Sequence, residues 1–203
     1  RWFGQSVHAS GFTVIERLAM LARDAVLEHH SALVASNAMR ENIHVVLREP
    51  GATARVRTLF VGSADNQFDL GVTAEHRAPR TTSDLRAKGV LAGKAQAVVR
   101  GLVRVTQGAA GSDGYQRCDA LLLSPTAEVD PVPNLEIATN DVRCTHGVTV
   151  SHVNPESLFY LQSRGLPEKE ARNTLVEGFA GSMLQKYPQG MRETLGAQSR
   201  EIL

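Results

Sequence analysis

The sequence has few cysteines, little net charge and no long apolar run, and each shortage excludes a class of protein. Two cysteines in 203 residues, Cys118 and Cys144, are too few for the disulfide framework of a small secreted domain. Their spacing matches no zinc-finger pattern, so they predict reduced thiols in a reducing compartment. A formal net charge of +1 gives no field that would favour nucleic acid or an anionic membrane surface as a partner.

No stretch approaches the roughly 18 apolar residues that cross a bilayer, and the start of the chain lacks the charged-then-apolar layout of a signal peptide. We therefore expect a cytoplasmic protein, or a protein of the plastid stroma in a plastid-bearing eukaryote. Because residue 1 is Arg rather than Met, we expect an N-terminal segment of the protein to precede it. Residues 108–114 contain several glycines but no following Lys-Ser/Thr, so we expect this chain to bind no nucleotide.

Short apolar and β-branched runs separated by Gly, Asn, Asp and Pro fill most of the first 140 residues and predict β structure. The candidate strands are 43–48, 55–61, 95–105, 120–123 and 135–139. Pro125, Pro131 and Pro133 cannot donate to a sheet ladder and are predicted to lie in connections. Irregular spacing and the lack of Asn-Gly hairpin turns favour a stacked parallel β-helix over a meander. Periodicity alone leaves a β-sandwich equally open.

Two helices are predicted after Val153. Asn154 suits an N-cap, Pro155 the first helical position and Gly165 the left-handed residue past a helix end, which predicts a helix over 155–164. A second helix begins after Pro167, carries an apolar face that recurs every four residues, and ends near Pro188. That face consists of Ala171, Leu175, Phe179 and Met183. Residues Leu195–Leu203 are predicted to form a short helical or frayed tail.

Cys144 and His146 are two residues apart, so in a strand their side chains share one face. Thiolate and imidazole together suit iron, zinc or copper, although a Cys-x-His pair taken alone is more often a buried cysteine beside a surface histidine. Cys118 follows Arg117, which would lower the pKa of the thiol, although a lone cysteine is more often a small hydrophobic residue at a strand edge. In a β-helix with rungs of roughly twenty-odd residues the two cysteines and His146 would lie near one another.

Two enzyme hypotheses compete with a metal-binding scaffold. A thiol enzyme would use Cys118 or Cys144 as nucleophile, with His76, His146 or His152 as base, but no orienting residue is evident. A β-helix carbohydrate-active enzyme would need clustered acidic residues along one groove, and the sequence offers no such cluster. The adjacent His29 and His30 are interpreted as solvated surface residues rather than metal ligands.

The C-terminal third of the chain resembles the SufB/SufD family of iron–sulfur cluster assembly scaffolds, and its SufD-like members most closely. The resemblance lies in residues 134–137, 140–150, 156–165 and 170–180, with weaker similarity at 24–30, 75–79, 88–91 and 93–95. It implies a right-handed parallel β-helix over residues 1–153, followed by a helical region over 154–203 that docks the ATPase SufC. The chain itself would be a non-enzymatic scaffold.

The resemblance also implies partners and cargo. Sulfur from a cysteine desulfurase, delivered through a SufE- or SufU-like carrier, would meet iron on the scaffold and form a transient iron–sulfur cluster for apo-proteins. A second SufB/SufD-type chain, identical or different, would complete a SufBCD-type complex in which the cluster site lies where two β-helices meet.

Residue by residue, the resemblance assigns His146 to cluster assembly and Cys118, a SufB-like cysteine in a SufD-like frame, to sulfur acceptance. Both would contact iron transiently, and Cys144 belongs to the same motif. The residues expected to bind SufC are Pro155, Leu158, Phe159, Tyr160, Arg164, Gly165, Ala171, Leu175 and Phe179.

Overall fold

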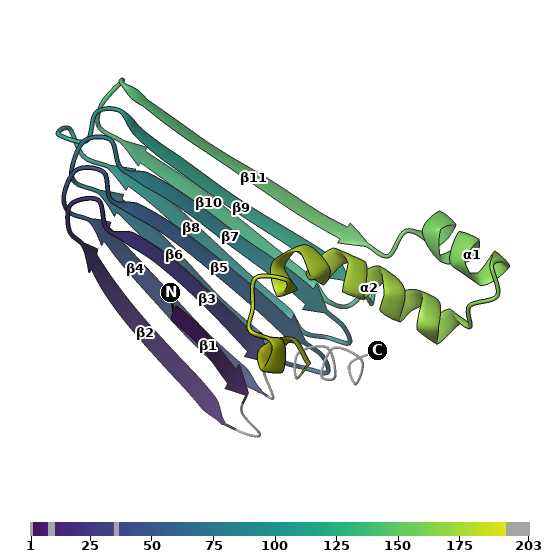
Figure 1. Ribbon diagram of the computed structural model, residues 1–203. Helices are drawn as coiled ribbons and strands as arrows, with labels where there is room; N and C mark the ends of the chain where they lie inside the picture. The colour runs from purple at the N-terminus through teal and green to yellow at the C-terminus, as the bar shows by residue number, and fades with distance from the viewer. Residues whose placement is uncertain (1, 8–10, 35–36, 194–203) are drawn as a thin grey trace.

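The structure is a computed structural model that describes residues 2–7, 11–34 and 37–193, with the side chains of 2–7 left out. The predicted tail Leu195–Leu203 lies outside these residues. Within them, strands precede two helices (Figure 1). The elements are β1 (Trp2–Val7), β2 (Phe12–Leu21), β3 (Val26–Val34), β4 (Ala38–Leu47), β5 (Thr53–Gly62), β6 (Gln67–His76), β7 (Thr82–Leu91), β8 (Gln96–Val105), β9 (Ser112–Leu122), β10 (Glu128–Ile137), β11 (Val142–His152), α1 (Pro155–Ser163) and α2 (Glu168–Leu184).

The strands form two sheets that face each other, and consecutive strands alternate between them. One sheet has the order β1-β3-β5-β7-β9-β11 and the other β10-β8-β6-β4-β2. Each strand pairs in parallel with the strand two elements away, as in the β5–β7 and β6–β8 pairs. This arrangement is a parallel β-helix, as predicted, and it replaces the sandwich because no strand pairs with its neighbour in sequence (Figure 1).

The space between the two sheets holds most of the core. Inward side chains alternate with outward ones along each strand, and residues in register stack from turn to turn. Phe60 of β5 and Phe68 of β6 meet there with ring centroids 5.6 Å apart. Val45 and Leu91 are fully buried in the same interior. A helix of this kind needs no strict sequence repeat because each turn buries its inward residues on the next.

Each predicted strand overlaps an observed strand, and four of the five extend one or two residues beyond it. Two of the three prolines were placed wrongly. Pro125 lies in a turn as expected, whereas Pro131 and Pro133 lie inside β10. β10 ends its sheet and pairs only with β8. Pro131 and Pro133 are two residues apart, so both nitrogens point to the same side, away from β8, where no ladder bond is needed.

Helix α1 begins and ends as predicted. The Asn154 Oδ1 atom accepts a hydrogen bond from the backbone N–H of Glu156 at 2.8 Å, and Pro155 occupies the first turn. Past the end of α1, Gly165 adopts a φ of +93° that favours glycine. No residue of α1 is buried, and the helix extends beyond the sheets (Figure 1).

Helix α2 returns across the outer face of the first sheet. Its buried side chains are Ala171, Val176, Ala180 and Met183. The last three of these pack with Tyr187, past the helix end, against outward residues of β5, β7 and β9, namely Leu59, Val61, Val90 and Leu121. Two of the four residues predicted for the apolar face, Leu175 and Phe179, are therefore only half-buried, because the helix meets the sheet along a face rotated from the strict four-residue pattern.

Candidate functional site

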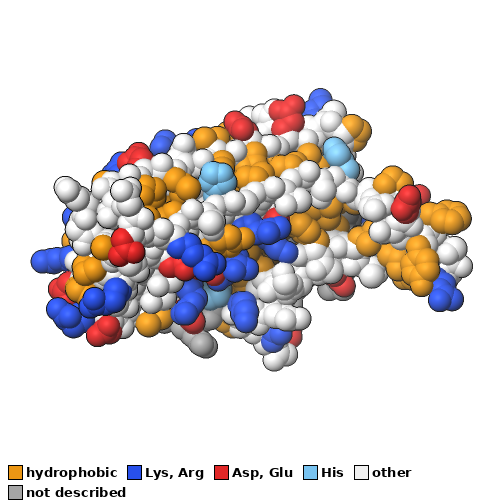
Figure 2. Space-filling view, turned by 90° about the horizontal axis from the view of Figure 1, so that it is seen from above, with side chains coloured by type: hydrophobic (Ala, Val, Ile, Leu, Met, Phe, Trp, Pro, Cys, Tyr) orange, Lys and Arg blue, Asp and Glu red, His pale blue; other side chains and the backbone are white. Residues whose placement is uncertain are grey.

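The last turn of the β-helix leaves one end of the interior uncovered by further strands of the described chain. β10 and β11 end their respective sheets there. The inward positions of β11 match the buried positions of β9 in register and include Cys144, His146, Val148 and Val150. Val148 and Val150 are 44% and 41% exposed, which is high for residues on an inward face. Seen from above, the end that carries β11 presents a band of apolar side chains with histidine among them (Figure 2).

Cys118 and His146 lie on this same inward face, on adjacent strands. His146 pairs with Gln116, which is two residues before Cys118 on β9. A strand spacing of about 4.8 Å and a rise of about 3.3 Å per residue place the two α-carbons about 8 Å apart. The structure therefore brings the predicted cysteine and histidine together as diagonal neighbours.

Cys144 lies farther along the face than the sequence suggested. It pairs with Gly114, four residues before Cys118, which places the two cysteine α-carbons about 14 Å apart. That distance excludes a disulfide between them. The Cys144 sulfur occupies the space above Gly114, where an added β-carbon would approach it to 3.3 Å. Cys144 and Cys118 are therefore on neighbouring strands, as expected, but do not share one cluster of ligands.

The Cys118 thiol is buried beside a small cavity. Its exposed fraction is 7%, and the cavity, about 40 Å³ in volume, is lined in part by Pro131, Pro133 and Val148. Burial raises the pKa of Cys118 to about 12, and nearby Asp119 adds to this. The thiol is therefore protonated at neutral pH.

The predicted effect of Arg117 on Cys118 is wrong. Successive side chains of a strand point to opposite faces, so Arg117 is on the outer face while Cys118 is inside. The Arg117 Nε atom donates to both carboxylate oxygens of Asp119 at 2.9 Å. The guanidinium charge is thus paired at the surface, and burial is the main influence on the pKa of the Cys118 thiol.

The described residues contain no group of three or more His, Cys, Asp or Glu side chains arranged to hold a metal ion. Cys118 and His146 supply one soft sulfur donor and one imidazole donor. Two donors leave the remaining positions around an iron atom to sulfide, to a carrier or to a second chain. The chemistry of the pair suits iron, zinc or copper.

Among the described residues, His76 and His152 do not form a catalytic pair with either cysteine. His76 is fully buried, and its Nδ1 and Nε2 atoms are 2.7 Å and 2.8 Å from the hydroxyls of Thr81 and Ser83. Burial lowers the pKa of His76 to about 4. His152 is exposed at the end of β11. Of the three candidate bases of the thiol-enzyme hypothesis, His146 is therefore the one placed near Cys118, and His76 and His152 are not.

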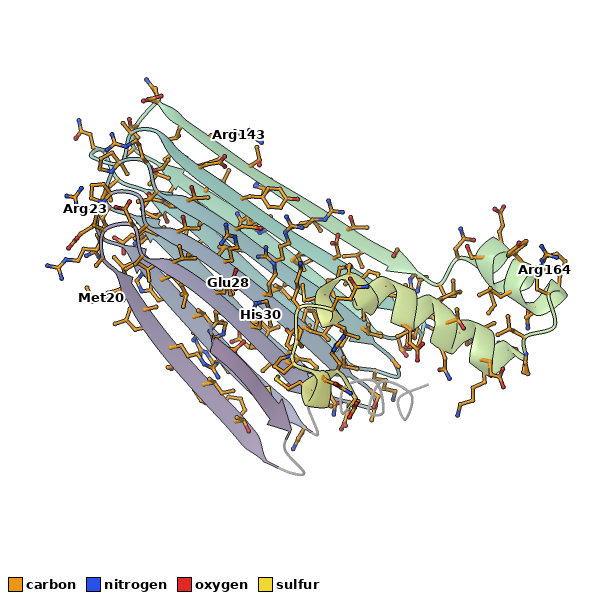
Figure 3. The ribbon with its side chains drawn as sticks, in the orientation of Figure 1. Met20, Arg23, Glu28, His30, Arg143 and Arg164 are labelled. Carbon is orange, nitrogen blue, oxygen red and sulfur yellow. The ribbon has the colours of Figure 1, made fainter. Side chains whose placement is uncertain are left out.

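His29 and His30 are buried, which corrects their interpretation as solvated surface residues. His29 faces the interior, where burial first and the Arg17 charge second lower its pKa to about 4. His30 faces outward and meets the Tyr187 ring edge-on, with ring centroids 5.5 Å apart. The segment after α2 covers His30 (Figure 3), and no local sequence pattern indicated this contact.

The predicted partner-binding residues differ in exposure, and Leu158, Leu175 and Phe179 are half-buried. Phe159 and Tyr160 of α1 are 71% and 57% exposed, and Arg164 projects from the far end of this helix (Figure 3). Ala171 is completely buried and supports α2 rather than offering a contact surface. Among the described residues no helix is long and apolar enough to cross a membrane.

Two residues that shape the candidate site were not identified from the sequence. Val148 lies directly opposite Cys118, and the Gln116 side chain donates from Nε2 to the Asn134 carbonyl at 2.9 Å. A signal for Val148 existed, because Cys144, His146, Val148 and Val150 alternate along one face. No local signal identified Gln116, whose partner lies 18 residues away.

Comparisons with known proteins agree with this architecture. Residues 4–179 match a family model described as "SUF system FeS cluster assembly, SufBD core domain". The iron–sulfur cluster assembly protein SufD of Escherichia coli is 33% identical over 166 residues, covering 82% of this chain and 39% of that protein.

Two mycobacterial SufBD family proteins give similar matches. One from Mycobacterium tuberculosis is 32% identical over 177 residues, covering 87% of this chain and 21% of that protein. One from Mycobacterium leprae is 30% identical over 211 residues, covering 99% of this chain and 53% of that protein. The chain thus spans about half or less of the length of these relatives.

Proposed function

The chain belongs to the SufBD core family of iron–sulfur cluster assembly proteins, and from this premise we propose that it is a scaffold on which a cluster forms at the open end of the β-helix. The observation that carries the proposal is the placement of Cys118 and His146 as diagonal neighbours on the inward face of β9 and β11. Cysteine and histidine are both established ligands of iron–sulfur clusters. The cluster is cargo that passes to apo-proteins, and its type is left open.

Cys118 would accept sulfur and contact iron, and His146 would contact iron. Because the thiol is buried and protonated, binding of iron has to drive loss of its proton, as metal coordination does for thiols in general. His146 is exposed and open to approach from outside the β-helix. We assign Cys144 a supporting position in the same face, since Gly114 and the adjacent core fix its sulfur.

A second chain of SufB/SufD type would complete the site. Both edge strands at this end carry unpaired backbone groups that another chain can bind, and Val148 and Val150 offer apolar area. Either a homodimer or a heterodimer would then place ligands from two chains around one cluster. Sulfur would come from a cysteine desulfurase through a SufE- or SufU-like carrier in the cytoplasm, where thiols stay reduced.

The helical region over 154–203 would dock a SufC-like ATPase, so the scaffold itself would need no nucleotide site. An isolated nine-residue helix is marginal in water, yet α1 buries none of its residues. A partner that covers Phe159 and Tyr160 would stabilise it. ATP hydrolysis on the partner would then drive conformational change in the scaffold.

Anaerobic reconstitution with ferric iron, a thiol reductant and sulfide tests the site. We expect an absorption band typical of a cluster in the wild-type chain and its loss in Cys118→Ala and His146→Ala. Cys144→Ala should retain more of the band because of its distance from Cys118, and His152→Ala is the matched histidine control. A band of full intensity in both Cys118→Ala and His146→Ala would refute the assignment.

A further inference from the structure

Three arginines stand side by side on the outer face of the first sheet. Arg57 of β5 pairs in register with Arg86 of β7, which pairs with Arg117 of β9. Adjacent strands are about 4.8 Å apart, so the row extends over about 10 Å. Like charges placed directly opposite each other destabilise a sheet, and a net charge of only +1 for the chain means that this concentration is local.

A groove runs between this row and helix α2. Its volume is about 320 Å³, and its lining includes Arg57, Arg86, Lys88, Arg117, Met183 and Lys186. The space-filling view shows Lys and Arg side chains gathered midway along the molecule, on the side that α2 covers (Figure 2). The groove therefore has a cationic floor and a wall formed by a helix.

The carboxylates of the chain only partly balance these cations. Asp84 accepts hydrogen bonds from both Arg57 and Arg86, and Asp119 pairs with Arg117. Lys88 donates to the Phe179 carbonyl at 2.7 Å and to the Ser182 hydroxyl at 3.0 Å, which are uncharged acceptors. Five cations thus share two carboxylates, because Lys186 also faces the groove.

The arginines keep capacity for further acceptors. Arg86 uses Nε to bind Asp84 at 2.9 Å, and its guanidinium lies over the Tyr115 ring at 5.3 Å. A guanidinium has five N–H donors, so one carboxylate contact leaves most of them for a ligand or water. The side chains of Arg86 and Arg117 are 48% and 43% exposed.

The row is closed at one end and open at the other. On β3 the next position is His30, which Tyr187 covers. On β11 the next position is Gly147, and a β-carbon added there would meet no atom within 4 Å. A segment of another protein can therefore enter across the β11 edge and lie along the arginines.

We propose that this groove binds an acidic segment of a partner protein, with Asp or Glu side chains placed along the Arg57–Arg86–Arg117 row. Carboxylates on one face of a helix, four residues apart, are spaced by about 5–6 Å, close to the spacing of the strands. Guanidinium groups bind carboxylates with two parallel hydrogen bonds. Met183 and Tyr115 provide apolar contact for side-chain methylenes.

The linear spread of charge favours such a segment over a small anion, which would need donors converging on one point. The groove is on the outer face, whereas Cys118 and His146 are on the inner face. The proposal is therefore independent of the cluster site, and failure of either leaves the other standing.

The test uses the full chain and a fluorescent helical peptide of about sixteen residues with glutamate at every fourth position, compared with its glutamine version. We expect Arg86→Gln/Arg117→Gln to weaken binding of the acidic peptide by about tenfold or more. Lys186→Gln, in the turn after α2, should weaken it by about threefold. The matched control is Arg23→Gln/Arg48→Gln, which removes the same charge from exposed turns; Arg23 is far from α2 in Figure 3.

Carbodiimide coupling maps the bound peptide, because it joins carboxylates to nearby amines. We expect coupling at Lys186 and not at Lys94 or Lys169. Equal weakening by Arg23→Gln/Arg48→Gln, or equal binding of the glutamine peptide, would overturn the proposal. Displacement of the peptide by about millimolar phosphate or pyrophosphate, but not by chloride at the same ionic strength, would instead identify a small-anion site. That result would also overturn the proposal.

Discussion

Val148 lies directly opposite Cys118 where β11 pairs with β9, and both line the same small cavity. Val148 is 44% exposed whereas Cys118 is 7% exposed. The Val148 side chain on this edge strand therefore lies beside the sulfur at the open end of the β-helix. The thiol is protected and protonated until that strand moves or a partner binds.

Alkylation should report this protection. In the wild-type chain near neutral pH, we expect Cys144 to react with a maleimide faster than Cys118, because Cys144 is half-buried and Cys118 is buried. Val148→Ala should speed modification of Cys118 by roughly threefold or more, since it removes two methyl groups from the cavity lining. Peptide mass spectrometry over time measures both rates.

Val150→Ala is the matched control for this experiment. Val150 has similar exposure but lies opposite Ala120 rather than Cys118. It should leave the Cys118 rate unchanged. Rapid modification of Cys118 in the folded wild-type chain would contradict the protected thiol and favour a thiol enzyme.

Acid should destabilise the fold through His76. The pKa of His76 is lowered from 6.5 to about 4 by burial, so the folded state favours the neutral ring. This contribution to stability is fully present above about pH 6.5 and is lost as the pH falls toward 4. The pKa difference corresponds to at most about 3 kcal/mol. Urea unfolding across this pH range measures it.

The comparison of wild type with His76→Gln isolates this residue. The variant should be less stable at pH 7, because it disturbs the contacts to Thr81 and Ser83, but its stability should fall less between pH 6.5 and 4. Glu41 has the opposite effect on stability as the pH falls, since burial raises its carboxyl pKa. A parallel fall in both proteins would contradict the role of His76, and exposed His152→Gln should behave as wild type.

Tyr187 should anchor the segment after α2 to the sheet. Its hydroxyl donates to the Ser31 carbonyl at 2.6 Å, and its side chain is 3% exposed. Tyr187→Phe should lower the free energy of unfolding by about 1 kcal/mol and Tyr187→Ala by about 3–5 kcal/mol. Tyr160→Phe, on exposed α1, should change it by less than about 0.5 kcal/mol. Equal changes in the free energy of unfolding at the two tyrosines would refute the anchoring role of Tyr187.

Binding of SufC should depend on α1. Phe159→Ala should reduce retention of a SufC-type ATPase in a pull-down by about tenfold, because an exposed aromatic side chain is a strong interface anchor. Phe12→Ala is the control, since Phe12 is similarly exposed at 66% but lies on β2. Undiminished binding by Phe159→Ala together with Tyr160→Ala would contradict docking at this helix. Point variants are preferable to truncation after Val153, which would uncover the apolar face beneath α2.

The prolines of β10 show where reasoning from local sequence ended. A proline is excluded from the interior of a sheet but accepted at its edge. Which strand forms an edge depends on how many turns the β-helix has and where the chain turns into helices. The two prolines were therefore assigned to connections although both lie in a strand.

The prediction that His29 and His30 are exposed was wrong for a related reason. His29 and His30 adjoin in sequence but face opposite sides of β3, one toward the interior and one beneath Tyr187. Tyr187 is 156 residues beyond Ser31, whose carbonyl it binds. No pattern within a short window can predict a contact over that separation.

The sequence alone determined the features that depend on neighbouring residues. Asn154, Pro155 and Gly165 set the bounds of α1 because caps act within one helical turn, and alternation placed Cys144 and His146 on one face. Only the tertiary structure decided that Cys118 faces His146 rather than Cys144, that Cys118 is protonated, and that three arginines form a row. Those properties depend on the register between strands about thirty residues apart, which stacking of whole turns fixes.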